Sequence, residues 1–307
     1  MIANFFDKTK PINFLVLSII MAIVYIIGGL NFFEEDITFF LFLKKSAFLL
    51  LAILVIFFLN FIIRKNFLTD NNTYALLFFI LLLGLFSNVF FNRQILISNF
   101  ILLFAFRRIY SLRTVAKTKE KIFDAGFWIG LASLFYNWSI IYILLLYGAI
   151  WIFRKRDWKN MFIPIVGVVT PVFLLFVYLL VKNDAHQLVG FFNFHYSLDF
   201  QKYTFLPFLI PIIFIMILGL TAIIPTTQKS LLSKIDFKST WQILILQILL
   251  SLFIVILAPM KDGSEFLFLF FPLSILFANY FQGVNRYWVK EMILYLFVLL
   301  LIGVKLL

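Results

Sequence analysis

The sequence contains no cysteine. Without a thiol the chain can form no disulfide, no thiolate-bound metal site and no cysteine nucleophile. Charge is scarce as well, because charged residues make up 13% of the 307 positions, against about 25% in a typical soluble domain. Hydrophobic residues make up 64%, and Phe alone occurs 44 times. This composition argues against a soluble domain and predicts a membrane protein.

Several sequence patterns are also missing. The chain has no P-loop, GxGxxG, HExxH or GxSxG motif, so nothing in it points to cytoplasmic nucleotide chemistry. The alternating apolar and polar segments of outer-membrane barrels are absent too. The membrane-crossing segments are therefore expected to be α-helices.

Apolar runs of about 20 residues recur along the whole chain, and this length lets a helix cross a hydrocarbon core of about 30 Å. We predict an all-α polytopic bundle that forms a single transmembrane domain over residues 1–307. About 11 spans are predicted, at residues 11–32, 46–63, 74–91, 94–106, 123–136, 138–153, 161–181, 204–224, 241–258, 265–281 and 288–305. The helix of the fifth span, 123–136, is expected to begin before residue 123, within 113–122.

The distribution of Lys and Arg predicts the orientation of these spans, because these residues accumulate in short cytoplasmic loops. The first apolar stretch lacks a cleavage site and is expected to be a retained span. With a cytoplasmic N-terminus and a hairpin at Tyr136–Asn137–Trp138, 19 of the 26 Lys and Arg residues face the cytoplasm. If the two spans on either side of that hairpin were one span, Lys and Arg would be divided almost evenly between the two sides of the membrane. Two separate spans are therefore predicted for residues 123–153.

The net charge of +12 then lies on the cytoplasmic face. Attraction to anionic membrane lipids accounts for it, so nucleic acid is not expected as a partner. The basic segment 107–124 is predicted to lie on the anionic leaflet. Polar residues within spans, such as Asn88 and Gln247, are interpreted as interhelical hydrogen-bond partners.

Three predicted outer loops hold most of the residues that could do acid–base chemistry. Both histidines of the chain lie in the second loop, so all of its histidine and half of its carboxylates face outward. The loops are 31–45 with Glu34, Glu35 and Asp36; 182–203 with Lys182, Asp184, His186, His195, Asp199 and Lys202; and 259–266 with Lys261, Asp262 and Glu265.

The candidates have more than one interpretation. The triplet Glu34–Asp36 is either a solvated loop tip or a general base, or a ligand for a divalent cation. The histidines are interfacial residues, contacts for a substrate phosphate, or metal ligands. Asp262 and Glu265 are i, i+3 neighbours where a span begins, a position that favours acidic residues in any helix.

The order of several features resembles the GT-C glycosyltransferases, over about residues 11–281. In GGLNFFEEDIT an acidic motif directly follows the first span. GFWIGLASLFYNWSIIYILLLYGAIWIFRKRDWKN, at 126–160, is similar to the ascending and descending helix pair of that family. IPIVGVVTPVFLLFVYLL at 163–180 is similar to the next element, and KDGSEFLFLFFPLSILFANYF at 261–281 is similar to a late loop with a basic residue before a proline-containing span. The last span, 288–305, lies beyond the resemblance.

This resemblance implies a transferase that takes a sugar from a polyprenyl phosphate at the extracytoplasmic face. It implies that Glu34, Glu35 or Asp36 is the general base, and that Glu35 and Asp36 bind Mg²⁺ or Mn²⁺ where a divalent cation is used. The residues that it implies for the lipid phosphate are Arg93, Lys261, His195, Lys182 and Lys202, with Asp262, Glu265 and Asp199 as secondary acidic candidates.

The composition also resembles a multi-pass inner-membrane family of flavobacteria, which implies a bacterial cytoplasmic membrane. Two other functions fit the sequence. One is a non-catalytic scaffold or accessory subunit of an envelope export or assembly complex, with protein partners there. The other is a transporter of a lipid or polymer, although no predicted span interior carries a charged residue of the kind that ion-coupled transporters use.

Overall fold

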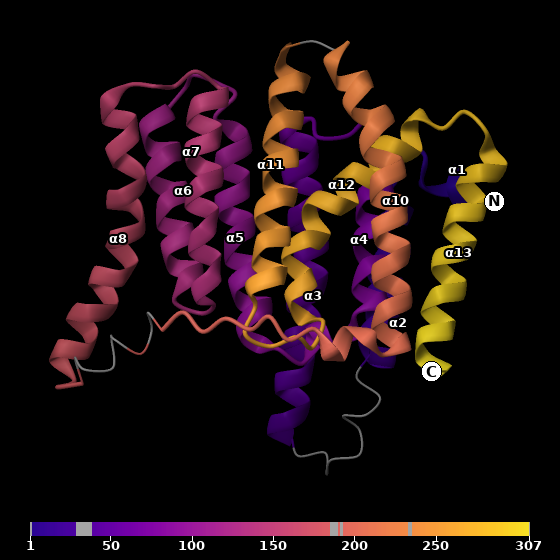
Figure 1. Cartoon of the computed structure of the whole chain (residues 1–307), viewed down its shortest axis with the longest axis horizontal. Coiled ribbons are helices and arrows are strands. Elements are labelled where there is room, and N and C mark those ends of the chain that lie inside the picture. The colour runs from indigo at the N-terminus through magenta and orange to yellow at the C-terminus, as the bar shows by residue number, and fades with distance from the viewer. Residues whose placement is uncertain (1, 29–38, 185–189, 191–192, 233–234, 307) are drawn as a thin grey trace. The chain divides into compact units, whose positions relative to one another are not determined.

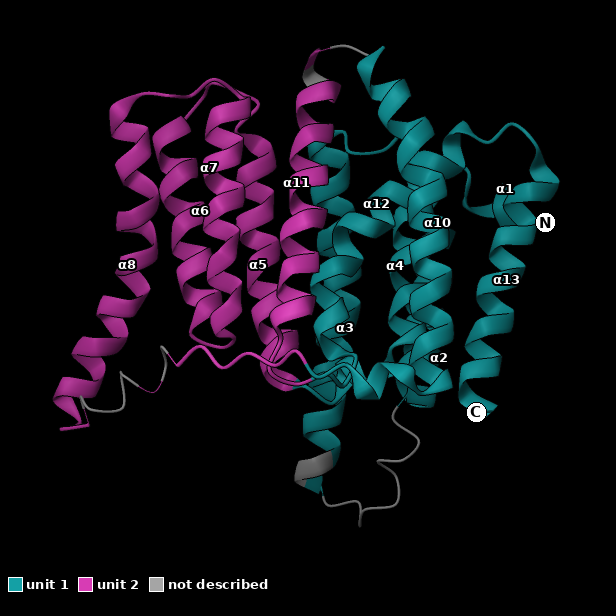
Figure 2. Ribbon diagram, viewed as in Figure 1, with its two compact units in different colours: residues 1–92, 199–232, 261–307 teal, residues 93–198, 233–260 magenta. Residues whose placement is uncertain are grey.

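The computed structural model describes residues 2–28, 39–184, 190, 193–232 and 235–306. Within these ranges the chain is helical and contains no strand, which confirms the predicted all-α class (Figure 1). The chain divides into two compact units, which Figure 2 colours separately. Unit 1 comprises residues 1–92, 199–232 and 261–307, and unit 2 comprises residues 93–198 and 233–260.

Each of the eleven predicted segments contains a helix, and a short helix α1 (Ile2–Phe6) precedes them. These helices are α2 (Pro11–Gly28), α3 (Phe39–Asn66), α4 (Tyr74–Leu85), α5 (Arg93–Ser111), α6 (Thr118–Ser133), α7 (Tyr142–Ile152), α8 (Trp158–Val181), α10 (Leu206–Leu231), α11 (Ile235–Leu257), α12 (Leu267–Gly283) and α13 (Tyr287–Leu306). Short 3-10 helices are η2 (Ser87–Phe90), η3 (Asn137–Ile141), η4 (Gln201–Thr204) and η5 (Ser264–Phe266).

Six stretches among the described residues are long and apolar enough to cross a membrane. They are Pro11–Gly28, Phe42–Asn66, Trp158–Val181, Leu206–Leu231, Phe237–Leu257 and Ser264–Gly283. Side chains that face outward from these helices are large and apolar, as in Phe57, Phe173 and Ile217. Such surfaces are stable in hydrocarbon, so the protein is a membrane protein.

Unit 1 is built around α4 and α12. All 12 residues of α4 are buried, because α2, α3, α12 and α13 pack against it. Aromatic rings fill the contact with α12, where Phe78 lies 5.1 Å from Phe281 and 5.7 Å from Phe277 between ring centroids. At 1.5 Å per residue, α4 is about 18 Å long, which is shorter than a hydrocarbon core.

The predicted span 74–91 is interrupted rather than continuous. Helix α4 ends at Leu85, and Phe86 has φ −120° and ψ 61°, outside the helical region. After this break the chain forms η2, where the Asn88 side chain donates a hydrogen bond of 2.8 Å to the backbone carbonyl of Asp262. The break therefore turns a polar side chain toward a distant loop of the same unit.

Unit 2 contains α5 to α8 and α11. Helices α6 and α8 approach each other through glycines, since a Cβ atom at Gly130 would lie 2.5 Å from the carbonyl oxygen of Val168. A Cβ at Gly167 would likewise lie 2.6 Å from the carbonyl oxygen of Phe123. Small residues at such crossings let helix backbones come close, which is a common basis of helix association in membranes.

Unit 2 confirms two predictions made from the sequence, the early start of α6 and the hydrogen bond of Gln247. Helix α6 begins at Thr118, within the basic stretch where an earlier start was expected, and α6 and α7 are separate helices on either side of η3. Gln247 is an interhelical partner as predicted, because its Oε1 accepts a hydrogen bond of 2.6 Å from the Tyr110 hydroxyl.

Candidate functional site

Five polar residues of unit 1 gather around two of its 3-10 helices, η4 and η5. We call Lys202, Tyr203, Lys261, Asp262 and Glu265 the loop cluster. The ring of Tyr203 in η4 lies 5.6 Å from the ring of Phe266 in η5, which joins the two halves of the cluster. Four of the five residues were predicted as site candidates; Tyr203 was not.

The turn before η5 is shaped by hydrogen bonds and by one glycine. The Asp262 carboxylate accepts hydrogen bonds from the backbone N–H of Ser264 at 3.0 Å and from its hydroxyl at 2.5 Å. Gly263 has φ 88°, a left-handed conformation that glycine adopts without steric cost. The side chains of Asn88 and Asn92 donate to the Asp262 carbonyl and the Ser264 hydroxyl, so η2 and the residues after it hold the turn in place.

Lys261 is a buried cation in this turn. Its side chain is 5% exposed, and its Nζ lies 5.0 Å from the ring centroid of Phe200. Burial disfavours the charged ammonium and lowers the pKa of Lys261 to about 8. Near neutral pH the residue is therefore a desolvated cation, which binds an anion more strongly than a solvated lysine does.

Glu265 is a buried carboxyl group with unsatisfied oxygens. The residue is fully buried, and its carboxyl oxygens lie near the backbone N–H groups of Asp262, Gly263 and Glu265 but form no hydrogen bond of regular geometry with any described residue. The positive charge of Lys202 lies close enough to the Glu265 carboxyl group to attract it electrostatically. The hydroxyl oxygen of Tyr203 is likewise buried without a partner in the described part of the chain. Unsatisfied buried polar groups are rare in proteins and suggest a ligand or a catalytic role.

Other elements of unit 1 end close to the loop cluster. A Cβ atom at Gly28, the last residue of α2, would lie 2.9 Å from the Cβ of Ser87 in η2. Lys305, near the end of α13, donates a hydrogen bond of 2.8 Å to the Ser87 hydroxyl. Because η2 contacts η5, the ends of α2 and α13 lie at the same end of unit 1 as the cluster.

Asp199, a secondary acidic candidate, precedes η4 in unit 1. Its carboxylate accepts a hydrogen bond of 2.9 Å from the backbone N–H of Gln201, so it shapes the start of η4. The side chain is exposed. It therefore lies on the solvent-facing side of the segment that carries Lys202 and Tyr203.

Three predicted phosphate contacts belong to unit 2. Arg93 is the first residue of α5, and Lys182 follows α8 with its Nζ 4.7 Å from the ring centroid of Tyr178. The backbone carbonyl of His195 accepts a hydrogen bond of 2.9 Å from the Trp138 indole, and its imidazole is exposed. Within the described ranges no hydrogen bond or ion pair joins these three side chains, so unit 2 does not assemble them into a site.

The triplet Glu34, Glu35 and Asp36 lies outside the described residues, as does His186. The predicted Mg²⁺ or Mn²⁺ ligands Glu35 and Asp36 are therefore outside them too. Elsewhere in the described chain, no group of three His, Cys, Asp or Glu side chains is placed to hold a metal ion.

Sequence reasoning did not identify Tyr203, Asn88 and Asn92 as parts of this site. Asn88 and Asn92 stand four residues apart in LFSNVFFN, a stretch whose only other polar residue is Ser87, and that pattern was a usable signal. Tyr203 carried no such signal, because aromatic residues make up 20% of the chain.

A family model described as "Family of unknown function (DUF6427)" matches residues 8–307. The match covers nearly the whole chain, so the protein belongs to this family. No curated protein and no solved structure matches the chain.

Proposed function

We propose that this member of DUF6427 is a membrane glycosyltransferase that moves a sugar from a polyprenyl-phosphate donor to an acceptor on the extracytoplasmic face. The observation that carries the proposal is the loop cluster of unit 1. It combines a buried lysine and a buried carboxyl group with unsatisfied oxygens, where the apolar helix α12 begins. A donor with a lipid tail and a charged phosphate needs such a boundary between apolar and polar surroundings.

The chemistry assigns a role to each part of the cluster. Lys261 and Lys202 bind the donor phosphate and stabilise the negative charge of the polyprenyl phosphate as it leaves. A carboxylate takes the proton of the acceptor hydroxyl while the acceptor oxygen attacks the anomeric carbon of the sugar. The bond from that carbon to the phosphate oxygen breaks, and its electron pair leaves with the phosphate.

Two sets of carboxylates compete for the role of base. The resemblance to GT-C glycosyltransferases favours Glu34, Glu35 or Asp36, which follow α2 in the chain. The unsatisfied oxygens favour Glu265 among the described residues. A Mg²⁺ or Mn²⁺ ion held by Glu35 and Asp36 is part of the first alternative only.

The finer topology is part of the proposal. We infer about 11 spans in a GT-C-like arrangement, a cytoplasmic N-terminus and a bacterial inner-membrane location. A helix in each predicted segment supports this inference, and so does the excess of Lys and Arg in the predicted cytoplasmic loops. With this orientation the loop cluster lies on the extracytoplasmic side.

The test is complementation of a deletion strain of the bacterial host with single variants. We expect Glu265→Gln or alanine at one triplet position to abolish a surface glycan, while the protein still accumulates in the membrane. Lys261→Met should reduce the glycan strongly, whereas Lys261→Arg should retain much of it. Glycan mass spectrometry and membrane immunoblots provide the two readouts.

The same experiment separates the alternatives. Unchanged glycans in Glu265→Gln, in each triplet variant and in the triple variant would exclude the transferase. A stoichiometric copurified partner with a dispensable cluster would instead indicate a scaffold. Lipid or polymer flux in proteoliposomes without any glycosyl donor would indicate a transporter.

A further inference from the structure

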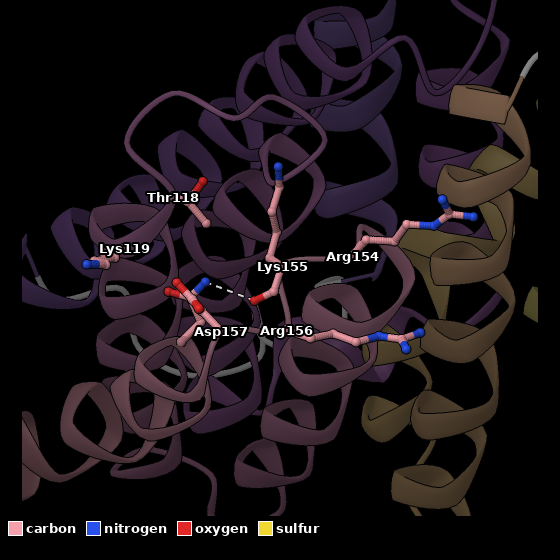
Figure 3. A pocket seen from close by; sticks show the side chains of 7 residues that line it. Thr118, Lys119, Arg154, Lys155, Arg156 and Asp157 are labelled. Carbon is pink, nitrogen blue, oxygen red and sulfur yellow. Dashed lines mark hydrogen bonds between the residues drawn. The ribbon is translucent and has the colours of Figure 1, made fainter.

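Unit 2 contains a basic pocket that the proposed transferase reaction does not use. The pocket is open, has a volume of about 510 Å³ and lies between the start of α6 and the turn that joins α7 to α8 (Figure 3). Its lining comprises Thr118, Lys119, Arg154, Lys155, Arg156, Asp157 and Asn160. All seven residues belong to unit 2, so the pocket is complete within one compact unit.

The backbone around the pocket presents two helix N-termini to it. Helix α6 begins at Thr118 and α8 begins at Trp158, directly after the lining residue Asp157. The carbonyl of Ile150 at the end of α7 already accepts a hydrogen bond of 2.9 Å from the N–H of Lys155 in the following turn. The N-termini carry partial positive charge and free N–H groups, which favour an anion.

The side chains of the lining add to this potential. Four of them are cationic, and only Asp157 is acidic. In the described part of the chain none of the four cations forms an ion pair. Their charge is therefore available to an anion that enters the pocket.

Asn160 provides a second and independent indication of a ligand. Its side chain is 6% exposed, and its Nδ2 donates a hydrogen bond of 2.9 Å to the Lys155 carbonyl. Its Oδ1 is buried and has no hydrogen-bond partner among the described residues. A buried acceptor without a partner is costly, so a ligand with a hydroxyl group would satisfy it.

The surroundings of the pocket place it at membrane-headgroup depth. Helix α8 is one of the six apolar stretches that can cross a membrane. Trp151 and Trp158, at the ends of the turn, are 58% and 68% exposed, and the Arg156 guanidinium lies 3.6 Å from the ring centroid of Trp151. Exposed Trp residues beside a span are typical of the headgroup region, and Arg there pairs with lipid phosphates.

We propose that this pocket binds the headgroup of an anionic phospholipid with free hydroxyls, of the phosphatidylglycerol type. Lys119, Lys155 and the two arginines extend in different directions around the pocket (Figure 3), so they attract the headgroup phosphate through their combined charge, and a headgroup hydroxyl donates to Asn160 Oδ1. The site shares no residue with the loop cluster and needs no glycosyl donor. It therefore holds whether or not the protein is a transferase.

Native mass spectrometry of the purified full chain in detergent tests this proposal, with phosphatidylglycerol and phosphatidylcholine as probes. We expect one phosphatidylglycerol to bind in preference to phosphatidylcholine. The Arg154→Gln, Arg156→Gln double variant should bind it about 30-fold more weakly, because each cation near an anionic surface contributes a factor of about five. The Arg64→Gln, Arg286→Gln pair removes the same charge from exposed sites outside the pocket and should bind like the wild type.

A gain-of-function variant guards against loss by misfolding. Asp157→Asn removes the only carboxylate of the lining and should tighten phosphatidylglycerol binding about threefold. A titration with inorganic phosphate distinguishes the two sources of the anion. Equal lipid binding by the double variant and the wild type would overturn the proposal, as would binding of inorganic phosphate without any preference for phosphatidylglycerol.

Discussion

At the scale of single residues, the burial of Lys261 has the clearest chemical consequence. Its pKa is lowered to about 8 from 10.5 in an unfolded chain. Between these two values the unfolded lysine holds a proton that the folded one has released. The free energy of unfolding therefore rises with pH over that window, since the unfolded state binds more protons.

Ligand binding should show the opposite dependence on pH. We expect the affinity for a polyprenyl-phosphate sugar to fall as the pH rises through about 8, because Lys261 loses its charge there. The phosphodiester of this ligand keeps one charge throughout, so its own titration does not interfere. Binding measured from pH 6.5 to 9.5 provides the test.

Lys261→Arg is the matched control, because an arginine stays protonated over the whole range. Its affinity should stay flat where the wild-type affinity falls. Parallel pH profiles for the two proteins would exclude Lys261 as the phosphate contact.

At the scale of elements, the contact between α6 and α8 depends on the absence of side chains at its glycines. Gly130→Ala would place a Cβ atom 2.5 Å from the Val168 carbonyl oxygen, so the two helices must move apart. We expect a loss of about 1–3 kcal/mol in the free energy of unfolding, as for other overpacked sites. Unfolding in detergent with increasing denaturant measures it.

Gly219→Ala provides the control, because nothing beyond the local backbone of α10 lies within 4 Å of a Cβ added at Gly219. The higher helix propensity of alanine should leave stability unchanged or slightly increased. Equal stability in both variants would mean that α6 and α8 do not rely on this close approach.

The elements also show what the sequence can and cannot predict. The lengths of the apolar runs were enough to predict a helix in every segment. The uneven distribution of Lys and Arg between the two sides of the membrane was enough to predict that α6 and α7 are separate helices. Three members of the loop cluster, Lys261, Asp262 and Glu265, were predicted because they are close together in the chain. The break after α4 was not predicted, because the local sequence does not show that Asn88 forms a hydrogen bond with a carbonyl 174 residues away.

At the scale of the whole molecule, the lack of cysteine makes the orientation directly testable. A single cysteine introduced at Lys182 should react with a membrane-impermeant maleimide in intact cells. One introduced at Arg286 should react only after the membrane is permeabilised. These outcomes follow from the predicted cytoplasmic N-terminus and the excess of basic residues on that side.

The unmodified chain is the natural control for this labelling, because it has no thiol to react. Labelling of the Arg286 position in intact cells, with protection of the Lys182 position, would show that the orientation is the reverse of the predicted one. The loop cluster would then face the cytoplasm, and an extracytoplasmic transferase reaction at that cluster would be excluded.

The fully buried helix α4 also constrains how the protein is made. Its partner α12 begins at Leu267, so more than half of the chain is synthesised after α4 and before α12. At about 5–20 residues per second, that interval lasts about 10–35 s. During this time α4 can pack against α2 and α3, which precede it in the chain, but its later partners α12 and α13 do not yet exist. Ribosome stalling or truncation before α12 should therefore leave a product that membrane proteases recognise and degrade.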